Sequence, residues 1–382
     1  DWPHIGYPII ECHANGHFTV TKPAGTGGLV SVATVAEQIL YEIGDPAAYE
    51  LPDVICDFTQ VTLVQLNSNE VSVTGAKGRV PSSRYKVSAT HRDGFRCNAD
   101  LVIVGQDAAA KAQRTAEAIL ERVRGICIQK AWGDFNRTHI DVIGSEGMYG
   151  PHAITRHSRE VVMRLAVTHN RKEALERFAM EIAAAGTSWS PGTAGSITSG
   201  RPSVTPLIRQ CAFWLEKNLV SIHVVIKDER REVKIPIDSK AAHIHPHDQS
   251  TAQSQQSVRT HVELNDAALN PDLQVPLIRI AYARSGDKGD ISNIGLIARR
   301  PEWVEILRDQ VTASKVADWL SHLVKGPVTR YELPGLSAFN YVCENALDGG
   351  GMTSLRADPL GKGMAQILLS MPVQLPELKA SL

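Results

Sequence analysis

Apolar and polar residues alternate along the chain with two periodicities, one typical of strands and the other of helices. Residues 5–11 and 17–21 are strand-like runs joined by Asn15-Gly16, the dipeptide that most strongly predicts a β-hairpin. Apolar residues at helical spacing predict helices at 32–43, 108–124 and 171–185. Further strands are expected at 61–66, 70–75, 85–90, 101–104, 140–143, 159–168 and 219–226. Residues 1–237 are therefore predicted to form a large α/β domain.

A polar segment separates this part from a second unit. Residues 238–273 are rich in glutamine and serine and predict a linker. From residue 274 to 382 the apolar runs resume, with strands expected at 276–283, 291–298, 328–333 and 364–371 and helices at 303–323 and 336–347. This alternation predicts an α+β domain of ferredoxin-like type.

Composition places the chain among ordinary globular proteins. Its 382 residues are 43% hydrophobic and 21% charged, enough for a sizeable core and two or three domains. The net charge of −1 provides no basic field to attract nucleic acid or anionic lipid, so neither is expected as a partner. The six cysteines are scattered without a CxxC pair, and no apolar run reaches the ~18–20 residues of a membrane helix. A cytoplasmic protein with reduced thiols is expected, and a first residue other than methionine predicts a processed or truncated start.

A glycine-rich loop at 22–28 is the first candidate binding site. It lies between a predicted strand and a predicted helix, where free amides favour an anion. Gly25, Gly27 and Gly28 would allow a ligand close to the backbone, while Thr26, Ser31 and Lys22 would add hydroxyl donors and charge. The alternative is that the glycines only turn the chain into the helix, since neither a Walker A nor a GxGxxG pattern is complete.

Two further loops carry polar side chains. In residues 185–202, Thr187 and Ser188 offer hydroxyl groups and Arg201 offers a bidentate anchor for carboxylate or phosphate, although a structural Ω-loop explains the segment as well. In residues 284–290, Ser285, Asp287 and Lys288 lie at a predicted strand end. The spacing there does not match a calcium loop, so no metal is expected. Asn293, just beyond, would need a hydrogen-bond partner if its strand is buried.

Two carboxylates are candidates for proton transfer. Asp57 lies in an apolar run, where desolvation would raise its pKa, and Glu146 lies in a glycine-rich loop. A capping or turn role is the simpler explanation for either residue. His157 stands between two arginines and could clamp a phosphate or form an exposed turn. His243, His245 and His247 alternate like metal ligands, but they fall in the predicted linker and are not interpreted as a built site.

Several of these motifs, in this order, resemble the acyclic terpene utilisation family, a long-standing domain of unknown function. In the N-terminal part the resemblance rests on residues 22–31, 41–46, 85–90, 185–191 and 200–202. In the C-terminal part, residues 284–290, 293–295, 349–351, 354–356 and 358–359 resemble the ferredoxin-like domain that closes family members. Family members carry additional sequence before the point where this chain begins, so a companion N-terminal chain is a possible partner.

The resemblance implies a role in the breakdown of terpenoids, whose intermediates are branched acyl-CoA thioesters. It supplies no catalytic residues. One hypothesis is therefore an enzyme, of hydratase or lyase type, that acts on an acyl-CoA or a related carboxylate. In it the 22–28 loop and Arg201 bind the anion, and Asp57 or Glu146 moves protons. No cofactor is expected beyond the CoA moiety of the substrate. The other hypothesis is a non-catalytic subunit of a degradative acyl-CoA-processing complex, and in either case an oligomer is expected. A nucleotide-dependent enzyme ranks third, because no phosphate motif is complete.

Overall fold

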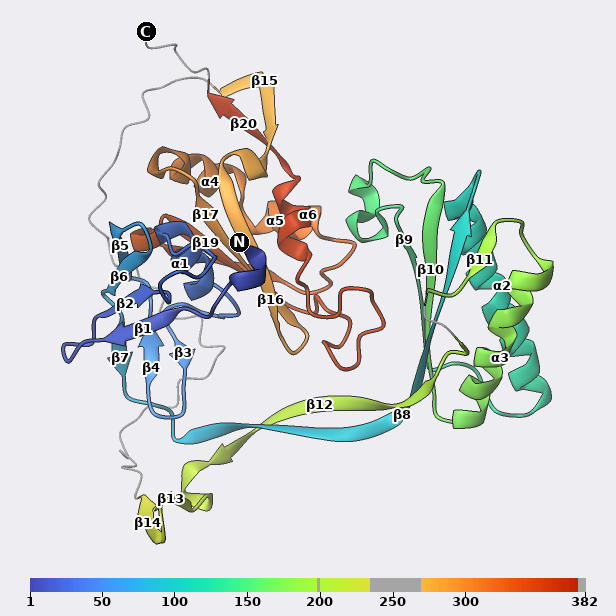
Figure 1. The fold of residues 1–382 in the computed structure, drawn as a ribbon, viewed down its shortest axis with the longest axis horizontal. Helices are drawn as coiled ribbons and strands as arrows, with labels where there is room; N and C mark the ends of the chain where they lie inside the picture. Colours follow the sequence, from blue (N-terminus) through green and yellow to red (C-terminus); the bar gives the residue numbers. More distant parts are fainter. Residues whose placement is uncertain (198–199, 234–268, 377–382) are drawn as a thin grey trace.

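A computed structural model describes residues 1–197, 200–233 and 269–376. They form two lobes joined by a long two-stranded ribbon (Figure 1). The composite lobe is built from both ends of the chain, residues 1–80 and 277–376, and the middle lobe from residues 95–205. Most of the predicted linker lies outside the described residues, and the predicted domain boundaries stay a prediction. In the described part of the chain, no helix combines the length and apolarity needed to cross a bilayer.

The N-terminal part of the composite lobe consists of two small antiparallel sheets and one helix. The hairpin predicted around Asn15-Gly16 is confirmed, and the strands predicted at 61–66 and 70–75 pair as a second hairpin, so that the four strands form a sheet in the order β1-β2-β6-β5. The strands of this sheet are β1 (Ile9–Cys12), β2 (Phe18–Thr21), β5 (Thr62–Asn67) and β6 (Glu70–Thr74). The second sheet has the order β3-β4-β7, with strands Tyr49–Glu50, Ile55–Asp57 and Lys77–Arg79. Helix α1 (Val32–Ile39) is capped by Ser31, whose side chain accepts a hydrogen bond from the Thr34 amide.

The C-terminal part of the composite lobe is an antiparallel sheet with helices on one face. Its strand order is β16-β17-β19-β18, formed by Ala281–Lys288, Ile291–Ala298, Ala338–Cys343 and Val328–Leu333. The helices are α4 (Val304–Gln310), α5 (Ala313–Trp319) and α6 (Met364–Leu369). Strands β15 (Leu269–Pro276) and β20 (Pro372–Pro376) pair beside them. Leu307, Tyr341 and Leu368 are fully buried in the core between sheet and helices.

Helix α1 packs on the other face of this sheet, so both ends of the chain share a core. Val35 and Leu40 belong to one buried cluster with Ile297 and Leu333. The approach is close at Gly295 in β17, where an added Cβ would lie 2.7 Å from the Cβ of Leu40. A glycine is required at this point because the helix leaves no room for a side chain.

Two buried asparagines join the C-terminal end of α1 to the sheet. The Asn293 side chain accepts a hydrogen bond from the Glu42 amide (2.8 Å) and donates to the Leu40 carbonyl (2.7 Å) and to Asn340 Oδ1 (2.8 Å). Asn340 donates to the carbonyls of Ile43 and Gly44. The expectation that Asn293 needs a partner in a buried strand is confirmed, because these side chains satisfy backbone groups that the helix end leaves open.

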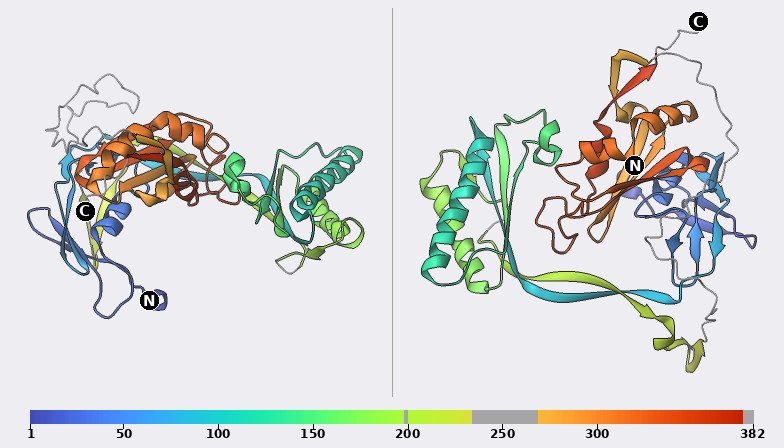
Figure 2. Two further views of the ribbon diagram at one scale, coloured as in Figure 1. Left: turned by 90° about the horizontal axis from the view of Figure 1, so that it is seen from above. Right: turned by 180° about the vertical axis from the view of Figure 1, so that it is seen from behind.

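The middle lobe has the strand order β11-β8-β10-β9, with every neighbouring pair antiparallel. Its elements follow one another as strand β8 (Arg84–Val104), helix α2 (Ala108–Gln129), strands β9 (Arg137–Ile143) and β10 (Glu160–His169), helix α3 (Lys172–Ser188) and strand β11 (Thr193–Gly195). This succession is the split βαβ arrangement of ferredoxin-like folds. Both helices cover the outer face of the sheet, and the open face is turned toward the composite lobe (Figures 1 and 2).

Strands β8 and β12 (Val204–Glu216) pair over twelve positions with a register shift between Pro206 and Ile208, and the nine pairs from Ile208 to Glu216 form the ribbon. Gly94, at a φ of 80°, lies next to this irregularity. The chain therefore enters and leaves the middle lobe through adjacent strands. Beyond the ribbon, β13 (Ile222–Ile226) and β14 (Glu229–Val233) form a separate hairpin.

The structure corrects several predicted elements. All the strand ladders of the described residues are antiparallel, so the large N-terminal part mixes helices and strands as predicted but is not a parallel α/β sheet. The segments predicted as separate strands at 85–90 and 101–104 are one 21-residue strand, β8. Strand β12 was not predicted, because residues 186–206, which lead into it, are rich in glycine and proline and suggested a loop.

For two segments of the C-terminal part, the predicted type of secondary structure is wrong. Residues 338–343, predicted as helix, are strand β19, whose aromatic and β-branched residues favour a sheet. Residues 364–369, predicted as strand, are helix α6, and its Met, Ala, Gln and Leu residues have high helix propensity. The apolar runs were too short for periodicity to separate the two structures. The helix predicted at 303–323 is interrupted between α4 and α5 at Val311 and Thr312.

Candidate functional site

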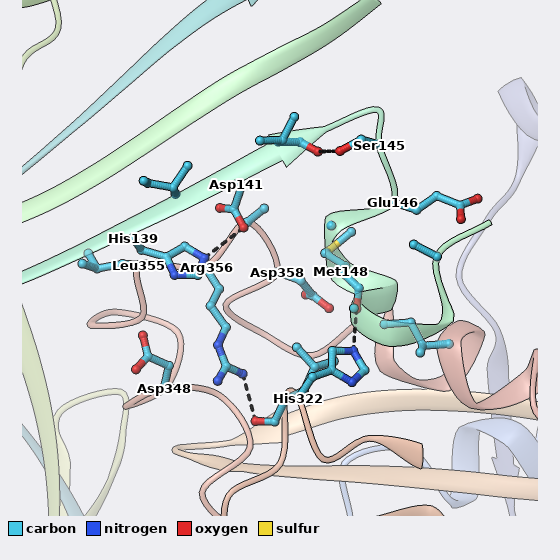
Figure 3. Close-up of a pocket in the computed structure, with 18 of the residues that line it drawn as sticks. His139, Asp141, Ser145, Glu146, Met148, His322, Asp348, Leu355, Arg356 and Asp358 are labelled. Atoms are coloured by element: carbon cyan, nitrogen blue, oxygen red, sulfur yellow. Dashed lines mark hydrogen bonds and ion pairs between the residues drawn. The ribbon is translucent and has the colours of Figure 1, made fainter. Parts of the chain in front are cut away.

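A cavity of about 740 Å³ lies between the open face of the middle lobe and the loops of the composite lobe (Figure 3). One wall is strand β9 with the turn that follows it, and the opposite wall is formed by His322 and residues 346–358. Its volume is in the range of small-molecule sites. We refer to this cavity as the interlobe cleft.

A histidine supported by a carboxylate lies on the β9 wall of the interlobe cleft. His139 and Asp141 are two residues apart in a strand and therefore share a face. Nε2 of His139 lies 2.9 Å from Oδ1 of Asp141, and the other carboxylate oxygen accepts a hydrogen bond of 2.7 Å from Arg164 on β10. When Nε2 donates to Asp141, Nδ1 of the neutral imidazole is left as a proton acceptor.

Asp141 is held in the charged form. Burial alone would raise its pKa, but the hydrogen bond and charge of His139 and the charge of Arg164 outweigh that effect and lower the pKa below its ordinary value. The side chain of Asp141 is only 15% exposed, whereas that of His139 is 33% exposed. The arrangement therefore combines a fixed, ionised carboxylate with an imidazole that a ligand can reach.

Two histidines join the lobes beside the cleft. Nε2 of His322, in the composite lobe, lies 2.9 Å from the Met148 carbonyl in the turn after β9. In return, Nε2 of His152 lies 2.8 Å from the Trp319 carbonyl and its ring stacks on Trp319. Burial lowers the pKa of His322, and the neighbouring charges of His152, Lys325 and Arg356 lower it further, although its hydrogen bond to Met148 opposes the shift. These two hydrogen bonds between the lobes thus fix the width of the cleft.

Glu146 is the one predicted acid–base residue that lines the interlobe cleft. Its Oε2 accepts hydrogen bonds from the amides of Ile154 (2.6 Å) and Thr155 (3.1 Å), and these bonds lower its pKa. Asp57 ends strand β4 in the composite lobe, where its Oδ1 accepts hydrogen bonds from the amide and hydroxyl of Thr59. Both carboxylates therefore have the turn-forming contacts that were the alternative to catalysis.

The glycine-rich loop at 22–28 uses its polar groups internally. Lys22 donates to the Thr26 carbonyl, the Thr26 hydroxyl donates to the Pro23 carbonyl (2.7 Å), and the Gly27 amide donates to the His4 carbonyl (3.0 Å). At the start of α1, the amides of Ser31 and Val32 donate to Thr34 Oγ1 and Gln65 Oε1. Gly25 and Gly28 have positive φ angles, as a turn into the helix requires. These contacts are those of a turn into the helix, and anion binding at the loop stays a prediction.

Thr187 and Ser188 form the last turn of α3 rather than a loop. Their hydroxyls bond back to the carbonyls of Ala183 and Ala184, so the helix continues through Gly186, where it was predicted to end. Arg201 is exposed on the segment that leads into β12. None of these three residues lines the interlobe cleft.

The segment predicted as a loop at 284–290 is largely strand β16, and its side chains connect it to α1 and α6. Buried Ser285 donates to the Gly361 carbonyl (2.6 Å) and accepts from the Ala365 amide (2.9 Å). Lys288 bonds to Glu42 at 3.0 Å, and Asp287 lies 3.6 Å from Lys362. These contacts are structural, and they join the two ends of the chain.

Glu42 makes the stability of this contact between the two ends of the chain depend on pH. Burial alone would raise its pKa, but hydrogen bonds from Lys362, Tyr41 and Lys288 lower it from 4.5 to about 2. A carboxylate with a depressed folded-state pKa stabilises the fold fully above pH 4.5 and loses that effect as the pH falls toward 2. We expect Glu42→Gln to lower the free energy of unfolding at pH 7. The free energy of unfolding should then differ less between pH 7 and pH 3 than it does in the wild type.

Chemical denaturation at these two pH values measures the effect. Glu50→Gln, at an exposed position in β3, is the matched control and should retain the pH dependence of the wild type. Equal acid sensitivity of the Glu42→Gln and wild-type proteins would contradict the assignment.

No three His, Cys, Asp or Glu side chains gather closely enough to hold a metal ion within residues 1–197, 200–233 and 269–376. His243, His245 and His247 lie outside the described residues. Asp290, the second carboxylate of the 284–290 segment, accepts hydrogen bonds from the Leu347 and Gly349 amides instead.

The sequence prediction missed His139, Asp141 and His322. A signal was present at 137–142, where charged or polar residues alternate with Thr, Ile and Val so that Arg137, His139 and Asp141 share one face of the strand. His322 carries no local signal, since its role depends on contact between lobes.

Two family models match the sequence. One, described as acyclic terpene utilisation family protein AtuA, matches residues 1–226, and the other, described as AtuA ferredoxin-like domain, matches residues 275–374. Searches of curated proteins and of solved structures found no match. The second model agrees with the ferredoxin-like domain predicted for the C-terminal part, and the first covers more than half of the sequence. The chain therefore belongs to the acyclic terpene utilisation family.

Proposed function

We propose that the chain is an enzyme of terpenoid or branched-chain acid catabolism. In this proposal the interlobe cleft binds an acyl-CoA thioester or a related carboxylate, and His139 acts as a general base in hydratase or lyase chemistry. The observation that carries the proposal is the contact of His139 with Asp141 and, through it, with Arg164. An imidazole oriented by a partly buried, ionised carboxylate is suited to accept a proton from water or from a substrate hydroxyl.

The lining of the cleft supports a substrate that is apolar at one end and charged at the other. Apolar side chains on both walls would contact a branched acyl group: Val142, Met148, Leu323, Leu355 and Ile367. Arg156 and Arg356 also line the cleft and would attract a carboxylate or a phosphate. Glu146 remains a candidate proton donor or acceptor there, although it anchors the 153–155 segment.

The test is turnover of a panel of branched acyl-CoA thioesters and the free acids by the purified chain. Product formation followed by mass spectrometry, together with its loss in a His139 variant, would support the proposal. If the chain, with and without a companion polypeptide, turned over no member of the panel, the enzyme proposal would be rejected.

A second candidate is a non-catalytic subunit of a degradative complex, and the ribbon favours it. Opposite pairs in the ladder place Tyr85, Val87, Leu215 and Phe213 on one face. Phe213 is 48% exposed. A two-stranded ribbon with an apolar face needs a further layer for stability. This candidate predicts that activity appears only in a complex with a partner protein, and that the His139 variant is as active in that complex as the wild type.

A further inference from the structure

Four side chains form a row across the open face of the middle lobe, at the edge of the interlobe cleft. In the β-ladder Thr168 of β10 lies directly opposite Arg137 of β9 on one side and Arg96 of β8 on the other, and Thr205 of β12 lies opposite Arg96. Residues that face one another across a ladder point to the same side of the sheet. Because strands are about 4.8 Å apart, the two arginines start roughly 10 Å apart and both reach over Thr168.

The hydroxyl of Thr168 is a buried polar group without a partner. The residue is 1% exposed, and in the described part of the chain its Oγ1 makes no hydrogen bond. Threonine hydroxyls at buried positions are normally satisfied, and an exception calls for an explanation. In the ladder, Thr168 stands between Arg96 and Arg137 on this face of the sheet.

The positive charge of this row is only partly neutralised. Arg137 pairs with Asp348, and Arg164, farther along β10, pairs with Asp141. Arg96 forms no salt bridge with an acidic side chain among the described residues, and its Nη1 donates to the Met352 carbonyl at 3.3 Å. Burial lowers the pKa of Arg96, and repulsion from Arg164 and Arg137 lowers it further. Asp100, on the same face of β8, accepts hydrogen bonds from Ser196 and the Ile197 amide.

The groups of the composite lobe that contact Arg96 and Arg137 are peptide carbonyls and, for Arg137, also the Asp348 carboxylate. Residues 348–355 of the composite lobe cross over the row, and Arg137 Nη1 donates to the Thr353 carbonyl at 3.2 Å. The bonds to the Met352 and Thr353 carbonyls, at 3.3 and 3.2 Å, lie at or just beyond the long end of the normal range. An oxyanion accepts shorter bonds from guanidinium, about twice as strong as those to a neutral carbonyl.

We propose that Arg96, Arg137 and Thr168 form a binding site for an oxyanion of the substrate, either a phosphate or a carboxylate. The inference deepens the proposed function and rests on it for the identity of the ligand as a substrate. The anion displaces the carbonyls of residues 352 and 353 as hydrogen-bond acceptors, and Thr168 donates the bond that it lacks in the free protein. His139 lies two residues from Arg137 on the same strand face, about 7 Å away. The anionic group is therefore held within a few bonds of the reacting centre.

Isothermal titration calorimetry of the full chain tests the site with inorganic phosphate, inorganic pyrophosphate and glutarate as probes. We expect saturable binding of at least one probe, weakened about 10- to 100-fold by Arg96→Gln, which removes a charged donor. Thr168→Val should also weaken binding but leave the unfolding midpoint unchanged or raise it, because the hydroxyl has no partner to lose. Preference for phosphate or for glutarate distinguishes the two sources of the oxyanion.

The controls separate this site from general charge and from catalysis. Arg92→Gln removes a cation from an exposed position of the same strand and should bind the probes like the wild type. His139→Ala should retain probe binding, so a failure of catalysis would not be mistaken for a failure of the site. Absence of saturable binding in the wild type overturns the inference, and so does wild-type affinity in both Arg96→Gln and Thr168→Val.

Discussion

Replacing His139 by alanine is expected to lower kcat by about 10²–10⁴-fold, the contribution typical of a positioned general base. The change removes the imidazole that Asp141 orients at the wall of the interlobe cleft. Asp141→Asn should lower kcat as well, because an amide in place of the carboxylate no longer stabilises the protonated imidazole. The measurement is steady-state turnover of the acyl-CoA substrate identified with the wild-type chain, together with thermal unfolding to show that each variant is folded.

His91→Ala provides the matched control for this prediction. His91 lies exposed on the ribbon, outside the interlobe cleft, and its loss should leave turnover unchanged. A His139→Ala protein that is folded and as active as the wild type would exclude His139 as the general base and leave Glu146 as the candidate.

Replacing Asn293 by alanine is expected to lower the free energy of unfolding by about 3 kcal/mol. The variant loses three hydrogen bonds and leaves the Glu42 amide, the Leu40 carbonyl and Asn340 without their buried partner. Each buried polar group left unsatisfied costs about 1–3 kcal/mol, and the groups of one network do not contribute independently. Urea denaturation followed by circular dichroism measures the change.

Asn218→Ala, at an exposed position after β12, is the control and should change the unfolding free energy by less than about 0.5 kcal/mol. A similarly small effect of Asn293→Ala would show that the contact between α1 and the C-terminal sheet does not contribute to the cooperative unfolding transition.

Local patterns in the sequence predict local structure well in this chain and long-range structure poorly. The hairpin around Asn15-Gly16 and helices α1, α2 and α3 follow from turn chemistry and apolar spacing, because both act within a few residues. Strands β12 and β19 depend instead on partners distant in sequence, β8 and β17. A sequence segment does not reveal which distant strand will pair with it.

The site was harder to predict for the same reason. Glycine-rich loops drew attention because a loop can be recognised without knowledge of the fold, but in the 22–28 loop the Lys22 and Thr26 side chains bond to carbonyls of the loop itself. His139 and Asp141 lie in a regular strand, and His322 lies 183 residues from His139. What makes them a site is the contact between two lobes, which no short motif encodes.

Entry and exit of the middle lobe through adjacent strands make that lobe a cassette inserted into the remainder of the chain. A two-residue turn could close the ribbon if the cassette were absent, and the composite lobe would keep its shared core intact. Half of the cleft would vanish with it. The proposed site and the shared core of the composite lobe are thus separable, and residues of the inserted cassette that line the cleft can change without altering that core.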